Sequence, residues 1–183
     1  MSDSKFREIT PENKHGIYKY LRGENTWVYL NIEGIDPFIP RDKYAVMYFD
    51  NAKCHACRRY DIYWFPFVRS LSSESNEFSF YIVLCNWFAR DCESLVASAT
   101  FTYFDVHSSP TTLLLSWIDG KVAYKEKYDG VLSDIDLKNI VPSFPERVSK
   151  FLKGEPVKPP LSKEDTIISL LSKLLKGKES AES

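Results

Sequence analysis

Residues 44–59 read YAVMYFDNAKCHACRR, and this stretch decides the fold. Tyr44 to Phe49 is an unbroken apolar and aromatic run, which predicts a strand buried on both faces of an α/β sheet. From Tyr60 onward the apolar positions follow helical spacing, at i, i+3, i+4, i+7, i+8 and i+11. Cys54 and Cys57 therefore lie between a buried strand and a helix.

The following segments predict a parallel crossover and then a hairpin. Residues 78–84 form a second unbroken apolar strand, and residues 90–99 predict a short helix after it. Two further strands, 112–118 and 121–128, flank Asp119-Gly120, a strong signal for a two-residue hairpin turn. We therefore expect a mixed sheet with a parallel β-α-β half, a C-terminal antiparallel hairpin and helices on both faces.

The ends of the chain predict additional elements. Thr10-Pro11 predicts the start of a helix over residues 10–21, and a strand follows at 26–32. A helix from Ser133 to about Leu152 is expected to be interrupted near its two prolines. The predicted organisation is an N-terminal helical extension (1–25), a core domain (26–153), a Pro-rich linker (154–161) and an amphipathic C-terminal helix with a tail (162–183).

Composition narrows the class of protein. The net charge of −1 and pI near 6.3 argue against nucleic-acid binding, which normally requires a basic excess. The first residues show no basic segment followed by an apolar run, and no stretch reaches the roughly 20 apolar residues of a spanning helix. We therefore expect a cytoplasmic protein without a spanning segment, in which the C-terminal helix packs on its own domain or mediates homo-oligomer formation.

The spacing and context of Cys54 and Cys57 predict redox chemistry. Free N–H groups and the positive end of the helix dipole stabilise a thiolate at a helix N-terminus. Lys53 and His55 add nearby positive charge, so Cys54 is the expected nucleophile and Cys57 the resolving thiol. Arg58 and Arg59 are expected on a solvated helix face.

Two stretches of the chain carry a family resemblance. The first is the strand that leads into Cys54-His55-Ala56-Cys57, and the second runs from Ser109-Pro110 through Asp119-Gly120 to Gly130. Together they resemble the thioredoxin family over roughly residues 26–152. The resemblance implies a thioredoxin fold and a protein disulfide oxidoreductase that needs no cofactor. Its partners would be protein disulfide or dithiol substrates and a reductase or dithiol donor.

The same resemblance assigns further roles. It implies that Pro110 is cis and lies opposite the cysteines, and that the backbone of Ser109 pairs with bound substrate like an added strand. The family's buried aspartate, six residues before the first cysteine, is replaced here by Tyr48. Asp50, four residues before Cys54, is a substitute candidate, although its position equally suits a turn residue or helix cap.

The other two cysteines leave several alternatives open. Cys85 and Cys92 could form a second disulfide or remain thiols, or all four cysteines could bind zinc. Disulfides are rare in cytosolic proteins outside hyperthermophiles, and a chain with no Gln and 24 Lys plus Arg against 25 Asp plus Glu leans towards that source. Trp87 and Phe88 are candidates for an apolar lip beside the active site. A non-catalytic interaction module with structural or vestigial cysteines is the competing functional hypothesis.

His55 also predicts the reduction potential of the pair. In the thioredoxin family, which this chain resembles, a histidine within the motif occurs in the more oxidising members, where it favours the thiolate and therefore the reduced form. We expect a potential on the order of −230 mV or higher, against about −270 mV for a thioredoxin. Equilibration with glutathione measures it, and a value more negative than thioredoxin's would contradict the prediction.

Overall fold

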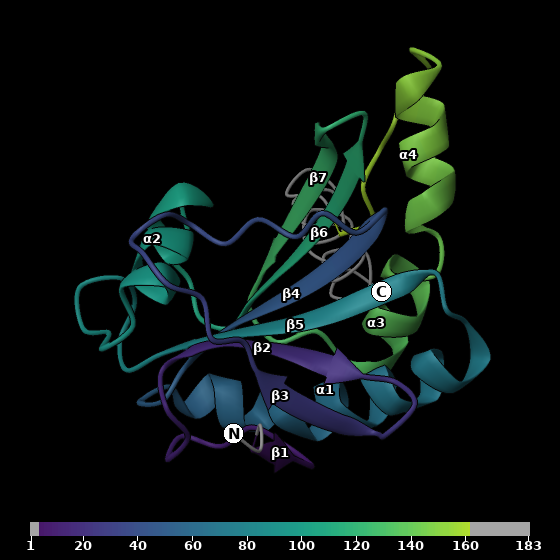
Figure 1. The fold of residues 1–183 in the computed structure, drawn as a ribbon. Helices are drawn as coiled ribbons and strands as arrows, with labels where there is room; N and C mark the ends of the chain where they lie inside the picture. Colours follow the sequence, from purple (N-terminus) through teal and green to yellow (C-terminus); the bar gives the residue numbers. More distant parts are fainter. Residues whose placement is uncertain (1–3, 162–183) are drawn as a thin grey trace, which may run out of the picture.

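The apolar run at residues 44–49 forms the central strand, β4 (Tyr44–Asn51), all of whose residues are buried. The computed structural model describes residues 4–161 and places β4 between β5 (Phe78–Cys85) and β6 (Thr111–Ile118) (Figure 1). β4 and β5 are parallel and are joined by α1 (His55–Glu74), whereas β4 and β6 are antiparallel. The predicted crossover unit is therefore confirmed.

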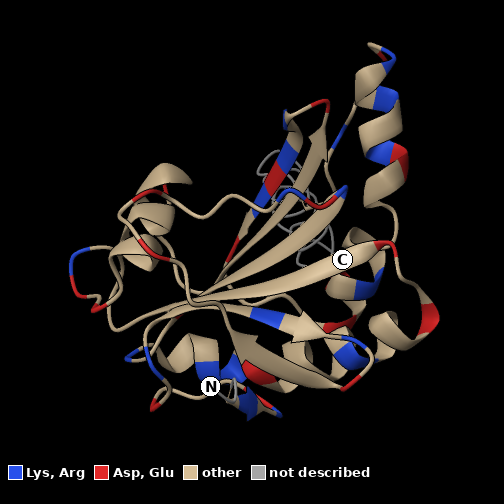
Figure 2. Cartoon of the chain, in the orientation of Figure 1, with Lys and Arg blue, Asp and Glu red and all other residues tan. Residues whose placement is uncertain are grey.

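The predicted hairpin is also confirmed. β6 pairs antiparallel with β7 (Lys121–Asp129), and Asp119 and Gly120 both have positive φ, 52° and 76°, as a tight two-residue turn requires. β7 is an edge of the sheet, and lysines alternate with acidic residues along it (Figure 2). Charge on an exposed edge strand opposes pairing with another chain.

The N-terminal segment differs from the prediction, because the helix expected over residues 10–21 is wrong. Thr10 to Asn13 form a turn with Pro11 as its second residue, closed by the Asn13 N–H to the Thr10 carbonyl. The chain then enters β2 (Gly16–Leu21), which pairs antiparallel with both β5 and β3 (Thr26–Tyr29). Burial of its aromatic and aliphatic side chains within the sheet outweighs the local helix signal.

The full sheet has the order β1-β3-β2-β5-β4-β6-β7, with β1 (Lys5–Phe6) as a two-residue edge strand. Helices cover both faces (Figure 1). One hydrophobic core joins the sheet to α1, α3 (Asp134–Ile140) and α4 (Phe144–Leu152). The other joins its opposite face to α2 (Leu95–Tyr103). The expected α/β class, with a mixed sheet and helices on both faces, is confirmed.

The structure gives more exact bounds for two of the predicted helical regions. The C-terminal helical region is divided, as expected, and Pro145 occupies the first turn of α4. α2, however, begins at Leu95 rather than at residue 90, because Ser94 is its N-cap and Cys85 and Cys92 are bonded to each other across the preceding loop. The amphipathic helix expected within residues 162–183 lies outside the described residues.

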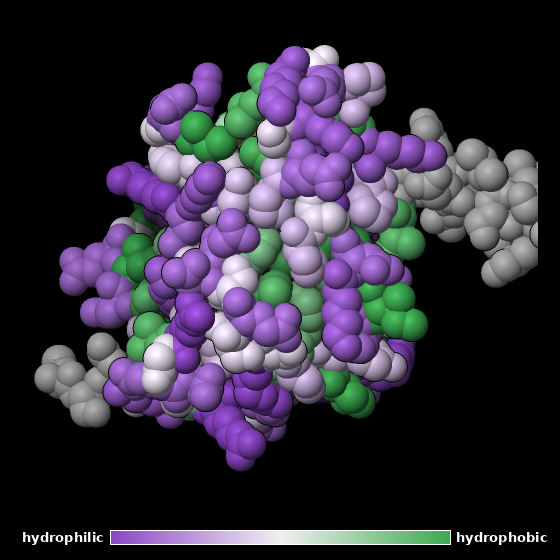
Figure 3. Space-filling view, turned by 90° about the vertical axis from the view of Figure 1, so that its right-hand side faces the viewer, coloured by the Kyte–Doolittle hydropathy of each residue, from purple (hydrophilic) through white to green (hydrophobic). Residues whose placement is uncertain are grey.

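The surface is chemically mixed. Positive and negative side chains are interspersed over the fold (Figure 2), and on the face shown in Figure 3 hydrophobic residues form small areas among hydrophilic ones. Within residues 4–161, no helix combines the length and hydropathy that crossing a bilayer requires. These surfaces do not by themselves indicate a binding site.

The start of β2 gives a test of the corrected N-terminal fold. Gly16 has a φ of +151°, and a Cβ built there would lie 2.4 Å from the Tyr29 ring. We expect Gly16→Ala to lower the free energy of unfolding by about 1 to 3 kcal/mol through this strain. Chemical denaturation measures the loss. Gly23→Ala is the control, since a Cβ there meets nothing within 4 Å, and equal stability of both variants would contradict the assignment of β2.

Candidate active site

Cys54 and Cys57 meet at the N-terminus of α1. Cys54 is the N-cap residue, and its sulfur accepts a hydrogen bond from the Cys57 N–H, with 3.0 Å between Sγ and N. The thiol thus takes the place of the side-chain oxygen that usually caps a helix. Both cysteines are free thiols, with Cys57 fully buried and Cys54 5% exposed.

A loop from the other half of the fold covers this pair. The Ser109–Pro110 peptide bond is cis and immediately precedes β6. The Cys54 thiol lies 3.5 Å from the Ser109 carbonyl oxygen, to which it donates. The Cys57 sulfur lies 2.9 Å from the Ser109 hydroxyl oxygen. The cis-proline therefore lies opposite the cysteine pair, as the family resemblance implied.

The chain has a divergent thioredoxin-like fold. The strand order β5-β4-β6-β7, the cysteine pair between β4 and α1, and the cis-proline before β6 together carry this assignment. The divergence lies in the N-terminal part, where β2 runs antiparallel to β5 and the hairpin of β2 and β3 extends the sheet.

Comparison with known proteins gives matches among solved structures alone. No protein-family model and no curated protein matches the chain. It is similar to the thioredoxin of Aeropyrum pernix, with 17% identity and a TM-score of 0.44 over 74% of this chain and 97% of that one. Chloroplastic thioredoxin z gives 12% identity and a TM-score of 0.43, over 58% and 81% of the two chains. The thioredoxin of Fasciola hepatica gives 20% and 0.38, over 56% and 81%.

Asp50 is a buried acid on the cysteine side of the sheet. It belongs to β4, so the alternatives of a turn residue or helix cap are wrong. Because side chains alternate along a strand, moving from Tyr48 to Asp50 keeps the side chain on the same face. Asp50 is 1% exposed, and burial raises the pKa of its carboxyl, while the charge of Arg58 opposes the rise.

The charge of Asp50 acts directly on the resolving thiol. Burial raises the pKa of the Cys57 thiol well above its ordinary value, and the nearby negative charge of Asp50 raises it further. The interaction with Cys57 in turn favours the ionised form of Asp50. Asp50 and the Cys57 thiol are thus buried neighbours whose proton affinities depend on each other.

Arg58 and Asp61 are site residues that sequence reasoning missed. Arg58 is not on a solvated face: its Nη2 lies 2.5 Å from Asp50 Oδ1, and its Nε lies 3.0 Å from Asp61 Oδ2. Tyr48 donates its hydroxyl hydrogen to Asp61 Oδ1 over 3.0 Å. The i,i+3 spacing of Arg58 and Asp61 was a signal available in the sequence, but the contact to Asp50 depends on how α1 packs on β4.

Lys53 and His55 lie on the outer side of the site. Lys53 forms an exposed ion pair with Asp91, with 3.2 Å between Nζ and Oδ2. His55 is exposed in the first turn of α1. Both side chains are exposed, so solvent screens the charge that they carry.

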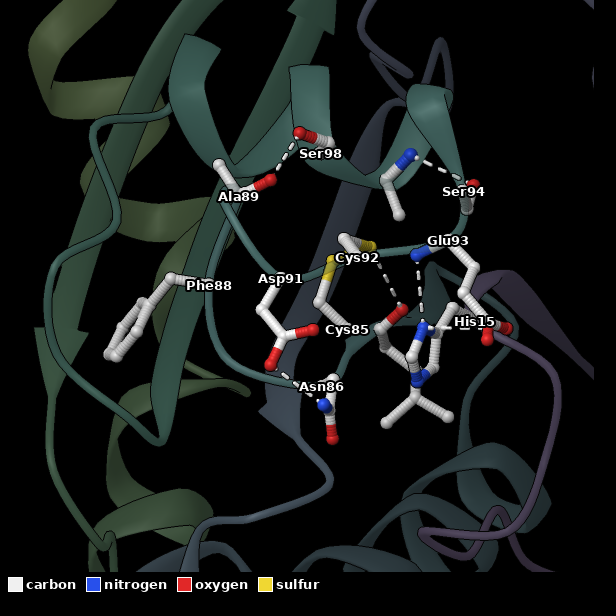
Figure 4. The surroundings of a disulfide bond; sticks show 12 residues. His15, Cys85, Asn86, Phe88, Ala89, Asp91, Cys92, Glu93, Ser94 and Ser98 are labelled. Carbon is white, nitrogen blue, oxygen red and sulfur yellow. Dashed lines mark hydrogen bonds and ion pairs between the residues drawn. A yellow bond between two sulfur atoms is a disulfide. The ribbon is translucent and has the colours of Figure 1, made fainter.

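Cys85 and Cys92 form a disulfide that closes the loop after β5 (Figure 4). This loop is joined to the residues that precede Cys54. The Ala52 N–H donates to the Cys85 carbonyl, and the Lys53 N–H donates to the Asn86 carbonyl, over 2.9 and 3.3 Å. The disulfide therefore holds a loop that supports the active-site turn, and it leaves no four-thiolate zinc site.

The two aromatic residues of this loop have different surroundings. Trp87 is 39% exposed, whereas Phe88 packs edge-to-face against Phe101 of α2. Of the two residues of the expected apolar lip, Trp87 is exposed and Phe88 is half-buried. Among residues 4–161, no group of three or more His, Cys, Asp and Glu side chains is placed to hold a metal ion.

The disulfide predicts a measurable loss of stability on reduction. Its cysteines are seven residues apart in the chain, and closing a loop of this size is worth about 2 to 3 kcal/mol through the entropy of the unfolded chain. We expect Cys85→Ala/Cys92→Ala to lose that amount in urea denaturation. The Cys54→Ser background, in which the active-site pair cannot close, isolates the effect. An unchanged midpoint with and without reductant in that background would contradict the prediction.

Proposed function

We propose that this protein is a thiol–disulfide oxidoreductase that exchanges disulfides with protein substrates through Cys54-His55-Ala56-Cys57. One observation carries the proposal. Two free thiols lie together at the N-terminus of α1, and the cis-proline loop contacts both of them through Ser109. Helix N–H groups at this position favour a thiolate on the capping residue.

The first step is attack by the Cys54 thiolate on one sulfur of a substrate disulfide. A bond forms between Cys54 and that sulfur, the substrate S–S bond breaks, and the other substrate sulfur leaves with the electron pair as a thiolate. Cys54, 5% exposed, is the thiol with access to solvent, and Cys57 is fully buried. This difference supports Cys54 as the nucleophile.

The second step is resolution by Cys57. Its thiol gives its proton to the Asp50 carboxylate, and the resulting thiolate attacks the Cys54 sulfur. The Cys54–Cys57 bond forms, the mixed disulfide breaks, and the substrate sulfur leaves as a thiolate that takes a proton from solvent. The substrate disulfide is reduced to two thiols, and the protein dithiol is oxidised. The reverse sequence oxidises a substrate.

Substrate binding is proposed to use the backbone beside the cis-proline. Ser109 lies partly buried next to both sulfurs. An extended substrate segment that pairs with this backbone would bring its disulfide to Cys54 with little dependence on side chains. We propose that the electrons come from a reductase or another dithiol protein in the cytoplasm, and that no cofactor is needed.

The competing interaction-module hypothesis loses its main support. It rested on Tyr48 at the position where the family carries a buried acid. Asp50 supplies a buried carboxylate on the same face of β4. A buried carboxylate beside the resolving thiol supports the catalytic proposal, because a vestigial pair has no need of a proton acceptor.

A trapping experiment tests the proposed function. In Cys57→Ser, attack by Cys54 still forms a mixed disulfide, but no thiol resolves it. We expect a stable adduct with insulin or another disulfide-containing protein, detected by mass, and at least a hundredfold loss of insulin reduction. Cys54→Ser/Cys57→Ser is the matched control and should capture nothing. No adduct on Cys57→Ser, together with no insulin reduction by the wild type, would contradict catalysis.

A further inference from the structure

The Arg58 guanidinium bridges two carboxylates beneath the cysteine pair. Its Nη2 contacts Asp50 Oδ1 at 2.5 Å and its Nε contacts Asp61 Oδ2 at 3.0 Å. The Asp50 side chain is 1% exposed, that of Asp61 18% and that of Arg58 28%. When both carboxylates are ionised, one positive charge faces two negative charges in a largely desolvated site. These three side chains would then carry a net charge of −1 in that site, which opposes ionisation of both carboxylates.

A tyrosine connects this group to the resolving cysteine. The Tyr48 hydroxyl donates to Asp61 Oδ1 over 3.0 Å, and its oxygen also lies 3.2 Å from the Cys57 carbonyl oxygen. Burial raises the pKa of Tyr48 well above its ordinary value, so the hydroxyl stays protonated and acts as a donor. We call Tyr48, Asp50, Arg58 and Asp61 the acid cluster. It extends from the buried thiol of Cys57 to the partly exposed Asp61.

The other charged groups near the cluster belong to the N-terminal segment and to α1. Glu8, from the N-terminal segment, raises the pKa of Asp61, and Glu8 is itself paired with Arg69 of α1, with 3.0 Å between Oε1 and Nη1. Glu12 of the same segment interacts with Arg58. From α1 the facing groups are Cys57 and Arg58, and from β4 they are Tyr48 and Asp50. Arg58 is the cation in contact with Asp50 and Asp61, and its single charge cannot neutralise both carboxylates at once.

Burial, followed by the charge of Asp50, raises the pKa of Asp61 to about 7, even though Arg58 lowers it. Burial also raises the pKa of Asp50. Two carboxylates in contact with one guanidinium titrate as a pair, so the proton belongs to both. Contact of both carboxylates with one guanidinium in a largely buried site therefore favours retention of one proton by the pair.

We propose that Asp50 and Asp61 share one titrating proton around Arg58, and that Asp61 thereby sets how readily Asp50 accepts the proton of Cys57. This inference rests on the proposed function, since it concerns the resolving step of that reaction. Asp50 accepts the thiol proton in the state in which the pair has released its own proton. Arg58 is then left to neutralise Asp61 alone, and the cluster loses its excess negative charge. Arg58 and Asp61 are positioning residues that act through Asp50.

The proposal predicts that a change at Asp61 affects one of the two steps of exchange and not the other. Removing the Asp61 charge lowers the pKa of Asp50, which makes Asp50 a weaker base. The attack by Cys54 does not involve this proton. A change at Asp61 should therefore alter resolution by Cys57 and leave the first step unchanged.

An NMR titration of the carboxyl carbons tests the shared proton without relying on activity. In the reduced full-length protein we expect Asp61→Asn to shift the titration midpoint of Asp50 downward by about one pH unit or more, and Asp50→Asn to shift that of Asp61 likewise. Glu146→Gln, which removes an exposed charge on α4, is the control and should shift neither. Independent titration of the two carboxylates, each unaffected by loss of the other, would overturn the proposal.

Kinetics then connect the cluster to exchange. We expect Asp61→Asn to lower the rate of mixed-disulfide resolution several-fold at its plateau and to move its pH midpoint downward. The rate of Cys54 alkylation by iodoacetamide and the KM for insulin should stay within twofold of the wild type. An unchanged resolution profile would overturn the role of Asp61. Coupled titration in a protein with no exchange activity would contradict the proposed function while supporting the shared proton.

Discussion

Burial of β4 on both faces is the constraint on which the rest of the structure depends. All eight residues from Tyr44 to Asn51 are buried, with β5 and β6 on either side and a hydrophobic core against each face. A shift of this strand by one residue would move every side chain to the opposite face of the sheet and into the other core. Its register therefore fixes where the chain leaves the sheet, where α1 begins and which side chains face the helix.

The active-site arrangement follows from that register. Asp50 is the last side chain of β4 that faces α1, and α1 returns across the same face, so Arg58 comes within ion-pair distance of it. The loop after the parallel strand β5 and the loop before the antiparallel strand β6 both lie beside the end of β4. Cys85 pairs with Asn51 in the β4–β5 register, and Thr111, which follows the cis-proline, pairs with Phe49. The disulfide loop, the cysteine pair and Ser109 are neighbours because the three strands are.

Asp50 places a buried carboxylate on β4, two residues after the position at which the thioredoxin family carries its aspartate. Comparison of spacing alone marks Tyr48 as a lost aspartate. In the sheet, Tyr48 and Asp50 share one face, since the side-chain period of a strand is two. Tyr48 then serves the acid cluster as a hydrogen-bond donor to Asp61. The position of the carboxylate has moved along the strand, but its side of the sheet has not.

The sequence by itself determined the elements whose signals are local and agree with their burial. The patterns of β4, α1 and the Asp119-Gly120 hairpin predicted the observed elements, because each depends on neighbours within a few residues. The same patterns predicted the position of Cys54 and Cys57 between a strand and a helix. Family resemblance added the cis form of Ser109–Pro110, which no local pattern requires.

Only the tertiary structure decided the remaining features, which depend on contacts between distant segments. Thr10-Pro11 carries a helix signal, yet residues 16–21 gain more by filling the sheet beside β5. The Cys85–Cys92 bond and the bridge from Arg58 to two carboxylates each depend on how separate elements pack. Whether a charge such as Asp50 faces solvent or a buried thiol is a property of that packing, and no pattern along the chain records it.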